Sequence, residues 1–221
     1  MSGNPNAGED QLNVFINCPY DDKYSPIMEA IVFAIIDCGF YPRCALETND
    51  ATQTRFEKLC DLIQASALGI HDISRFGIDT RTGVPRFNML FELGLYLGAS
   101  LFAPGESQRK ATLILDSDGG RYRAFVSDLA GQDIAEHGDR PEAAIVRVRD
   151  FLQANGCPLL PGGRYICSGY LSFRRDMPAI LKYLHIEDDE LTFLDRIRTI
   201  GEWLQLAPEA HAARGVHTYA L

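Results

Sequence analysis

"LNVFINCPYDDKYSPIMEAIVFAIIDCG", residues 12–39, decides the fold class of this chain. Its first seven residues form a short apolar run with β-branched and aromatic side chains, which predicts a buried strand. Ser25 suits the N-cap of the following helix and Pro26 its first position, and this helix is apolar on nearly every side until Gly39. A buried strand followed by a buried helix is the first half of a βαβ unit.

The same alternation continues along the chain. Strands are predicted at 41–47, 67–74 and 110–117, and helices at 54–66, 87–102, 122–131 and 141–156. Strands that alternate with helices form a parallel sheet with both faces covered, and right-handed crossovers then predict a doubly wound, flavodoxin-like α/β sheet of four or five strands. After a Pro- and Gly-rich break at 157–165, two more amphipathic helices are predicted at 176–186 and 188–206.

This pattern divides the chain into a loose N-terminal lead (1–11), a nucleotide-binding α/β domain (12–156) and a C-terminal helical extension (157–221). The predicted helices of the extension carry apolar faces that need a covering partner. That partner is either the sheet domain or another copy of the chain. The residues concerned are Leu181, Leu184, Leu194, Ile197 and Trp203.

The composition excludes several classes of function. The chain has 21 Lys and Arg against 30 Asp and Glu, a net charge of −9, which argues against nucleic-acid or anionic-membrane binding. No apolar run reaches the roughly 18 residues of a membrane span, and the start has no secretion signal, so we expect a cytoplasmic protein. The six cysteines are scattered without a CxxC pair, which favours free, buried thiols over a metal site or a disulfide framework. We expect no resident cofactor.

In an open parallel sheet, ligands bind beyond the carboxyl ends of the strands, near the point where the strand order reverses. Glu92 falls within the first two turns of the helix that begins near residue 87, so it can point from this helix into such a cleft. The helix N-terminus favours its ionised form. The other candidate binding residues follow the predicted strands or open this helix: Asn17, Pro19, Tyr20, Glu47, Asp72, Ser74, Arg75, Arg86 and Asn88. His71 is more simply a core histidine.

An ionised glutamate facing a second acid, Asp72, suits cleavage of an N-glycosidic bond. One carboxylate attacks or stabilises the oxocarbenium-like C1′, and another group handles the leaving base. Nicotinamide is already cationic in NAD and needs no acid, whereas a neutral nucleobase does. The segment 75–86 is longer than a minimal connection, and Arg75, Arg81 or Arg86 can meet a phosphate, which favours a nucleotide such as NAD as substrate. No Gly-x-Gly-x-x-Gly follows the first strand, which disfavours a Rossmann cofactor site.

"RFNMLFELGLYLGA" (86–99) resembles the Asn-x-x-Phe-Glu-Leu-Gly helix shared by nucleoside 2-deoxyribosyltransferase-like proteins and bacterial TIR-like NAD hydrolases. "LGIHDIS" (68–74) and "VFINCPYDD" (14–22) resemble the preceding strand and the first strand with its loop, so the likeness covers residues 12 to 118, about half the chain. The resemblance implies that Glu92 is the catalytic glutamate, that Asp72 positions substrate or acts as an acid, and that Asn17 and Tyr20 line the sugar pocket. It also implies an oligomer, here through the C-terminal helices, and a role in bacterial antiviral defence.

Two alternatives stay open. A non-catalytic nucleotide-sensing or signalling adaptor on the same scaffold shares every sequence feature with the enzyme. A phosphorelay receiver is weaker: Asp21, Asp22 and Asp72 imitate its acids, but Lys110 precedes its strand instead of ending it, and Glu92 is then unexplained. For both the enzyme and the adaptor, the expected partner is a small nucleotide or nucleoside.

Overall fold

The computed structural model describes residues 13–47, 51–75, 87–105, 109–118, 120–124, 126–155 and 159–206. At its centre is a five-stranded, all-parallel sheet in the order β2-β1-β3-β4-β5. The strands are β1 (Asn13–Asn17), β2 (Tyr41–Arg43), β3 (Leu68–Asp72), β4 (Ala111–Asp116) and β5 (Ile134–Glu136). The strand order reverses between β1 and β3, so the predicted doubly wound, flavodoxin-like α/β fold is confirmed.

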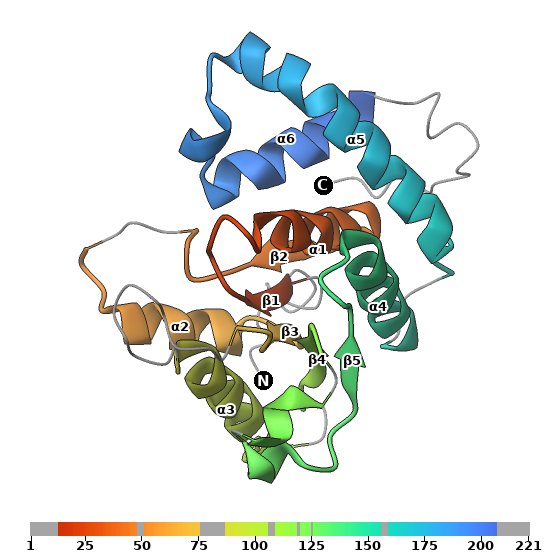
Figure 1. Ribbon diagram of the computed structural model, residues 1–221. Coiled ribbons are helices and arrows are strands. Elements are labelled where there is room, and N and C mark those ends of the chain that lie inside the picture. Colours follow the sequence, from red (N-terminus) through yellow and green to blue (C-terminus); the bar gives the residue numbers. More distant parts are fainter. Residues whose placement is uncertain are drawn as a thin grey trace.

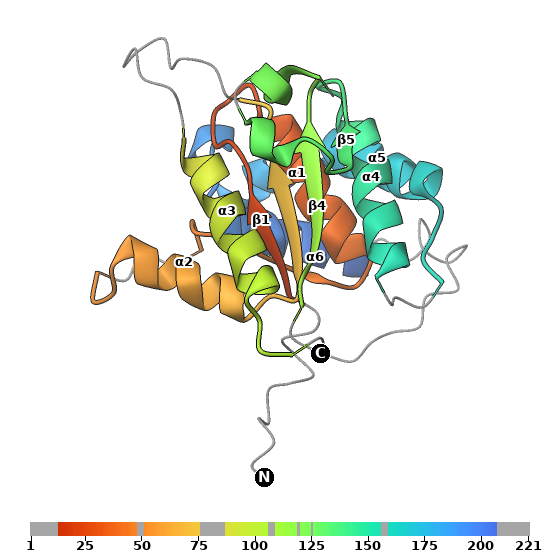
Figure 2. The ribbon, with the colours of Figure 1, turned by 90° about the horizontal axis from the view of Figure 1, so that it is seen from below.

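Helices cover both faces of this sheet (Figure 1). On one face lie α1 (Ser25–Asp37) and α4 (Pro141–Ala154), and on the other lie α2 (Arg55–Gln64) and α3 (Asn88–Leu101). Figure 2 looks at the parallel strands from the side of α2 and α3. A further layer, made of α5 (Gly163–Leu184) and α6 (Phe193–Leu206), packs on the outside of α1 and α4. Within the described ranges, no helix is long and apolar enough to cross a membrane.

The position of α1 explains its sequence. It lies between the sheet and the C-terminal helices, and every residue from Ile27 to Ile35 is buried. Leu181 and Ile197 are buried in the same core cluster, and Leu194 and Trp203 are partly buried against it. Leu184 is still 41% exposed. The sheet domain therefore covers most of the apolar faces that the sequence left without a partner.

Several element boundaries differ from the sequence-based expectation. The described residues of 122–131 are not α-helical: two short 3-10 turns, η3 (Arg121–Ala124) and η4 (Ser127–Leu129), precede β5. Helix α5 begins at Gly163, well before the predicted 176. The burial of Ile166, Tyr170 and Phe173 on one face stabilises this first part of the helix and offsets the low helix propensity of its glycines. Ser25 is not the N-cap of α1. Tyr24 is, because its N–H is bound by the Asp21 carboxylate at 3.1 Å. The five described cysteines are free thiols.

Gly69 allows α3 to approach β3 closely, and this contact generates a prediction about stability. A Cβ at Gly69 would lie 2.5 Å from the ring of Tyr96, which is fully buried. Gly69→Ala must displace this ring and should lower the free energy of unfolding by about 1–3 kcal/mol, the usual cost of overpacking a core. Urea unfolding measures it. Gly94→Ala is the matched control, because a Cβ there meets no atom within 4 Å. Equal stability of the two variants would contradict the close packing.

Candidate functional site

The carboxyl edge of the sheet gathers most of the residues expected at a site. Asn17 ends β1, Asp72 ends β3, and Glu92 lies in the second turn of α3. Pro19 is buried in the loop after β1, and Asn88 is exposed at the start of α3. Arg81 and Arg86 lie outside the described residues.

Asn17 ties α3 to the sheet. Its side-chain Nδ2 donates to the Met89 carbonyl at 2.7 Å and lies 3.1 Å from Nδ1 of His71. Because the amide nitrogen donates, His71 Nδ1 accepts, and the proton of the neutral ring sits on Nε2. The His71 ring is fully buried beside Phe15 and Tyr96, and burial lowers its pKa to about 3. His71 is therefore a neutral core residue, and Asn17 holds the first turn of the helix that carries Glu92.

A second polar cluster surrounds Asp72, whose side chain is completely buried. Its Oδ1 accepts the backbone N–H of Ser74 at 2.9 Å and also the Ser74 hydroxyl. The Nε2 atom of His137 lies 2.9 Å from Asp72 Oδ2 and 3.0 Å from Ser74 Oγ. His137 Nδ1 accepts the N–H of Asp139 at 3.1 Å, so the proton of the neutral ring is on Nε2 and faces the carboxylate. The backbone N–H and the hydroxyl of Ser74 both donate to Oδ1, so these hydrogen bonds fix the loop after β3 to the end of the strand.

Serine, histidine and aspartate meet in this cluster, but they do not form a nucleophilic triad. In a triad the serine binds one ring nitrogen of the histidine and the acid binds the other. Here Ser74 and Asp72 both approach Nε2 of His137, and Nδ1 is occupied by a backbone N–H. The arrangement joins loops and does not activate the serine.

Tyr24 connects this cluster to α1. Its ring lies edge-on to His137 with 6.5 Å between centroids, and it is fully buried. Burial first, and then the nearby charge of Asp72, raises the pKa of the Tyr24 hydroxyl well above its ordinary value. The loops after β1, β3 and β5 therefore converge on one carboxylate. His137 was missed by sequence reasoning, because the only signal is a three-residue strand before His-Gly-Asp.

Glu92 has a different environment. It is 9% exposed, and burial raises its pKa, while the positive charge of Arg55 at the start of α2 acts in the opposite direction. Cys18 and Tyr20 are near enough for the charge of Glu92 to raise their pKa values, after the larger effect of burial. Tyr20 remains 40% exposed, although its hydroxyl end bonds to the Cys44 thiol. Arg55, which the sequence did not single out, is thus the cation beside the candidate catalytic acid.

The two acids approach the edge from opposite faces of the sheet. Asp72 points to the same face of the sheet as Leu68 and Ile70, which pack with α1, whereas Glu92 projects from α3 on the other face. Cys18, in the loop after β1, is near enough to both carboxylates for their charges to raise the pKa of its thiol, after the larger effect of burial. The structure therefore brings Asp72 and Glu92 to one edge, on either side of the loop after β1.

Two further candidate binding residues have partners within the chain. Glu47 accepts from Arg43, with 2.5 Å between Oε1 and Nη2, and from the backbone N–H of Cys44 at 3.3 Å. Arg75 lies 3.7 Å from the Asp139 carboxylate through Nη2. A ligand that used either residue would compete with these contacts.

Two surface hollows of about 410 Å³ lie elsewhere, one between α5 and the turn before α6 and one beside β5, and neither is lined by Asp72 or Glu92. Among the described residues, no three His, Cys, Asp or Glu side chains are arranged to hold a metal ion. Comparison of the chain with protein-family models, curated proteins and solved structures gave no match. The chemistry of the edge must therefore be argued from its own residues.

Asp116, at the end of β4, is a further acid that sequence reasoning did not select. It is 1% exposed, and the backbone N–H groups of Ser117 and Asp118 bind its carboxylate, whereas no described residue makes a hydrogen bond to its Oδ2. Burial, opposed by these N–H groups and reinforced by Asp72, raises its pKa to about 6.

This raised pKa makes stability depend on pH. Well below pH 3.8, Asp116 is protonated in both the folded and the unfolded chain and costs nothing; the penalty grows as pH rises from 3.8 to about 6, and above that it is ionised in both and the burial penalty is fully present. Asp116→Asn keeps an oxygen for the two N–H groups and removes the charge. It should raise the free energy of unfolding at pH 7.5 by about 1 kcal/mol and by much less at pH 4. Denaturant unfolding at both pH values measures the difference. An equal effect at both pH values would contradict the assignment.

Proposed function

We infer that this chain cleaves or transfers the N-glycosidic bond of NAD or a related nucleotide or nucleoside in the cytoplasm. The observation that carries the proposal is the place of Glu92, in the second turn of α3 at the reversal point between β1 and β3. A largely buried carboxylate with a raised pKa near a positive charge, here that of Arg55, is typical of a catalytic group. The resemblance of residues 86–99 to the deoxyribosyltransferase-like and TIR-like helix points to the same residue.

In this proposal Glu92 attacks or electrostatically stabilises C1′ of the sugar as its bond to the base breaks. Arg55 favours the ionised form of Glu92 that this step requires. The exposed part of the Tyr20 ring lines the sugar site, and Arg75 or Arg86 meets a phosphate. Asp72 acts by holding the loops of the edge in position, because Ser74 donates to its Oδ1 and Nε2 of His137 lies 2.9 Å from its Oδ2.

A nucleotide-sensing or signalling adaptor is the second candidate. The observation in its favour is that Asp72, the other acid of the edge, is completely buried among intrachain donors. Such a site can bind a nucleotide without cleaving it. A receiver has less support, since the residue after β5 is His137 where a lysine is wanted, and Asp72 is not exposed to accept a phosphate.

The first functional prediction concerns Glu92. Glu92→Gln retains the shape of the side chain and removes its charge. It should lower the turnover number at least ~10²-fold, the scale of losing one charge-stabilising group, with the fold intact. Chromatography of the base released from NAD and from deoxynucleosides measures it. Glu136→Gln is the matched control, because Glu136 is exposed at the carboxyl end of β5. Unchanged base release by Glu92→Gln would remove the proposal.

A second prediction separates the two roles of Asp72. If Asp72 only positions the loops, Asp72→Asn should reduce base release from NAD and from a neutral-base deoxynucleoside by the same factor. If it protonates the leaving base, the neutral-base reaction should suffer much more, since nicotinamide leaves without a proton. We expect equal loss, because the carboxylate already receives its donors from the chain. A selective loss on the neutral base would assign the acid role to Asp72. Circular dichroism of the variant shows whether the fold survives.

A further inference from the structure

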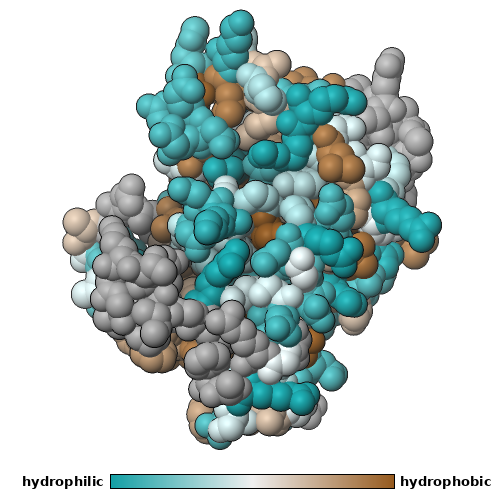
Figure 3. All heavy atoms as spheres, viewed as in Figure 1, coloured by the Kyte–Doolittle hydropathy of each residue, from teal (hydrophilic) through white to brown (hydrophobic). Residues whose placement is uncertain are grey.

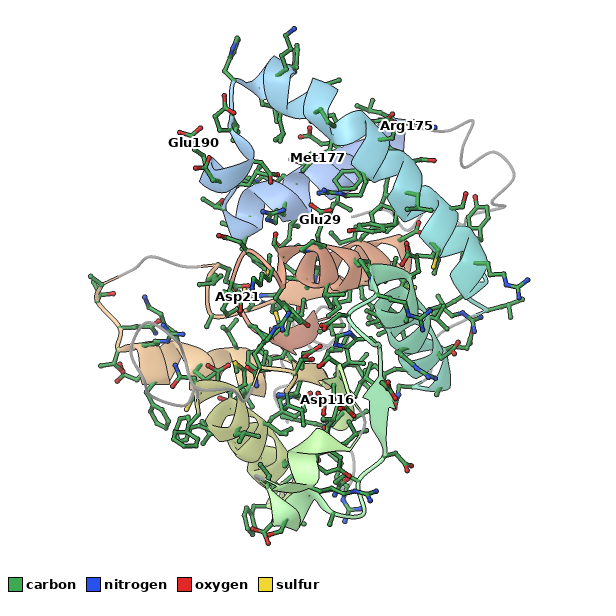
Figure 4. All side chains as sticks on the ribbon, viewed as in Figure 1. Asp21, Glu29, Asp116, Arg175, Met177 and Glu190 are labelled. Carbon is green, nitrogen blue, oxygen red and sulfur yellow. The ribbon has the colours of Figure 1, made fainter. Side chains whose placement is uncertain are left out.

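The C-terminal helices reach α1 through a buried charge. Glu29 on α1 is 1% exposed, and Figure 4 shows it on the side of α1 that faces α5 and α6. Its Oε1 lies 3.0 Å from Nη1 of Arg174 on α5, and its Oε2 lies 3.0 Å from Nη1 of Arg196 on α6. The Arg196 side chain is only 10% exposed. One carboxylate of the sheet domain is thus held by both helices of the extension.

Tyr170 on α5 extends this network to the backbone. Its hydroxyl lies 3.1 Å from the Pro26 carbonyl and 3.3 Å from Glu29 Oε1. Pro26 is in the first turn of α1, two residues after Tyr24, whose ring lies edge-on to His137, and Nε2 of His137 lies 2.9 Å from Asp72 Oδ2. A short chain of contacts therefore leads from α5, through the first turn of α1, to the carboxylate on which the loops of the edge converge.

Apolar contacts also join the C-terminal helices to α1. The interface is apolar around the buried charge, with Phe33 of α1 packed against Phe173 and Trp203 at centroid distances of 5.7 and 6.1 Å. Such contacts are non-directional, whereas a buried carboxylate that would be costly to leave unpaired accepts only one rotation and register of the helix. On the outer face of the molecule seen in Figure 3, hydrophobic residues lie in small groups among hydrophilic ones. The specific element of the interface is thus the Glu29 network.

We propose that Glu29 and Tyr170 are positioning residues of the candidate site: through them the C-terminal helices hold the first turn of α1, and with it Tyr24 and the loop after β1, against Asp72. The extension is then a part of the site's framework. That the network holds the first turn of α1 in place is independent of the proposed function. Only the effect of the network on turnover rests on that function.

Alkylation of Cys18 in the full-length protein tests whether the network holds this turn in place. Cys18 is 2% exposed in the loop after β1, and it reacts with iodoacetamide only when that loop opens. Cys38 is 7% exposed at the other end of α1 and serves as the internal reference. Tyr170→Phe removes one hydroxyl and Arg174→Gln removes one cation. Each should raise the labelling rate of Cys18, followed by peptide mass spectrometry, about fivefold, the effect of losing one hydrogen bond. The rate at Cys38 should stay unchanged.

Arg175→Gln is the matched control, since Arg175 is the next residue on α5, is 74% exposed and pairs only with its neighbour Asp176 at the surface. An unchanged Cys18 rate in both Tyr170→Phe and Arg174→Gln would overturn the proposal. So would a parallel rise at Cys18 and Cys38, because that pattern reports opening of the whole domain.

Base release provides the functional readout. In the same two variants kcat should fall several-fold with KM nearly retained, because the substrate site remains and the geometry of its framework loosens. A labelling change with no base release by the wild-type protein would leave the positioning role standing and reject the enzymatic function. A labelling change with undiminished kcat in an active wild type would restrict the network to structure and reject its link to the site.

Discussion

The carboxyl edge of this fold depends on how the buried carboxylate of Asp72 is satisfied. A carboxyl group with no exposure is tolerated only when polar groups of the chain replace its water. Ser74 in the next loop donates to Asp72, Nε2 of His137 after β5 lies 2.9 Å from it, and the Tyr24 ring at the start of α1 packs edge-on against His137. Three loops that the sheet merely brings near one another are thereby fixed together. The neutral tautomer of His137 follows from the same arrangement, since a backbone N–H occupies its other ring nitrogen.

This arrangement separates the tasks of the two acids of the edge. Asp72 holds the loops of the framework, whereas Glu92 is largely buried and the positive charge of Arg55 favours its ionised form. Asn17 links the two parts, because it ends β1 and its amide holds the Met89 carbonyl at the start of α3. One acid, Asp72, makes structural hydrogen bonds, and the other, Glu92, has a raised pKa. This pattern is expected when one acid positions a site and the other reacts in it.

The sequence predicted those elements whose hydrophobic pattern is long and regular. The strands ending at Asn17 and Asp72 and the helix carrying Glu92 were located to within a residue or two, and their carboxyl ends meet as expected. The short elements after β4 were missed. The strand β5 has three residues, and η3 and η4 lie where an α-helix was predicted. Hydrophobic periodicity cannot detect a short element that is stabilised by its contacts with neighbouring elements, as β5 is by its pairing with β4.

Partners distant in sequence were the other gap. Glu29 lies within the apolar run Ile27–Ile35 of α1, and the arginines that pair with it lie 145 and 167 residues further along the chain. His137 is 65 residues from Asp72, since 137 − 72 = 65. No local sequence pattern predicts either contact. The same limit applies to Arg55, whose role follows only from the packing of α2 beside α3.

A crystal structure of the Glu92→Gln variant with NAD, and separately with a deoxynucleoside, tests the central claim most directly. The account predicts that the sugar of a bound ligand lies at the reversal point between β1 and β3. Its C1′ should be within about 3.5 Å of the side chain of residue 92, the separation of reacting atoms in a productive complex. A nucleotide bound at another surface with residue 92 out of reach, or no binding of either compound, would contradict it.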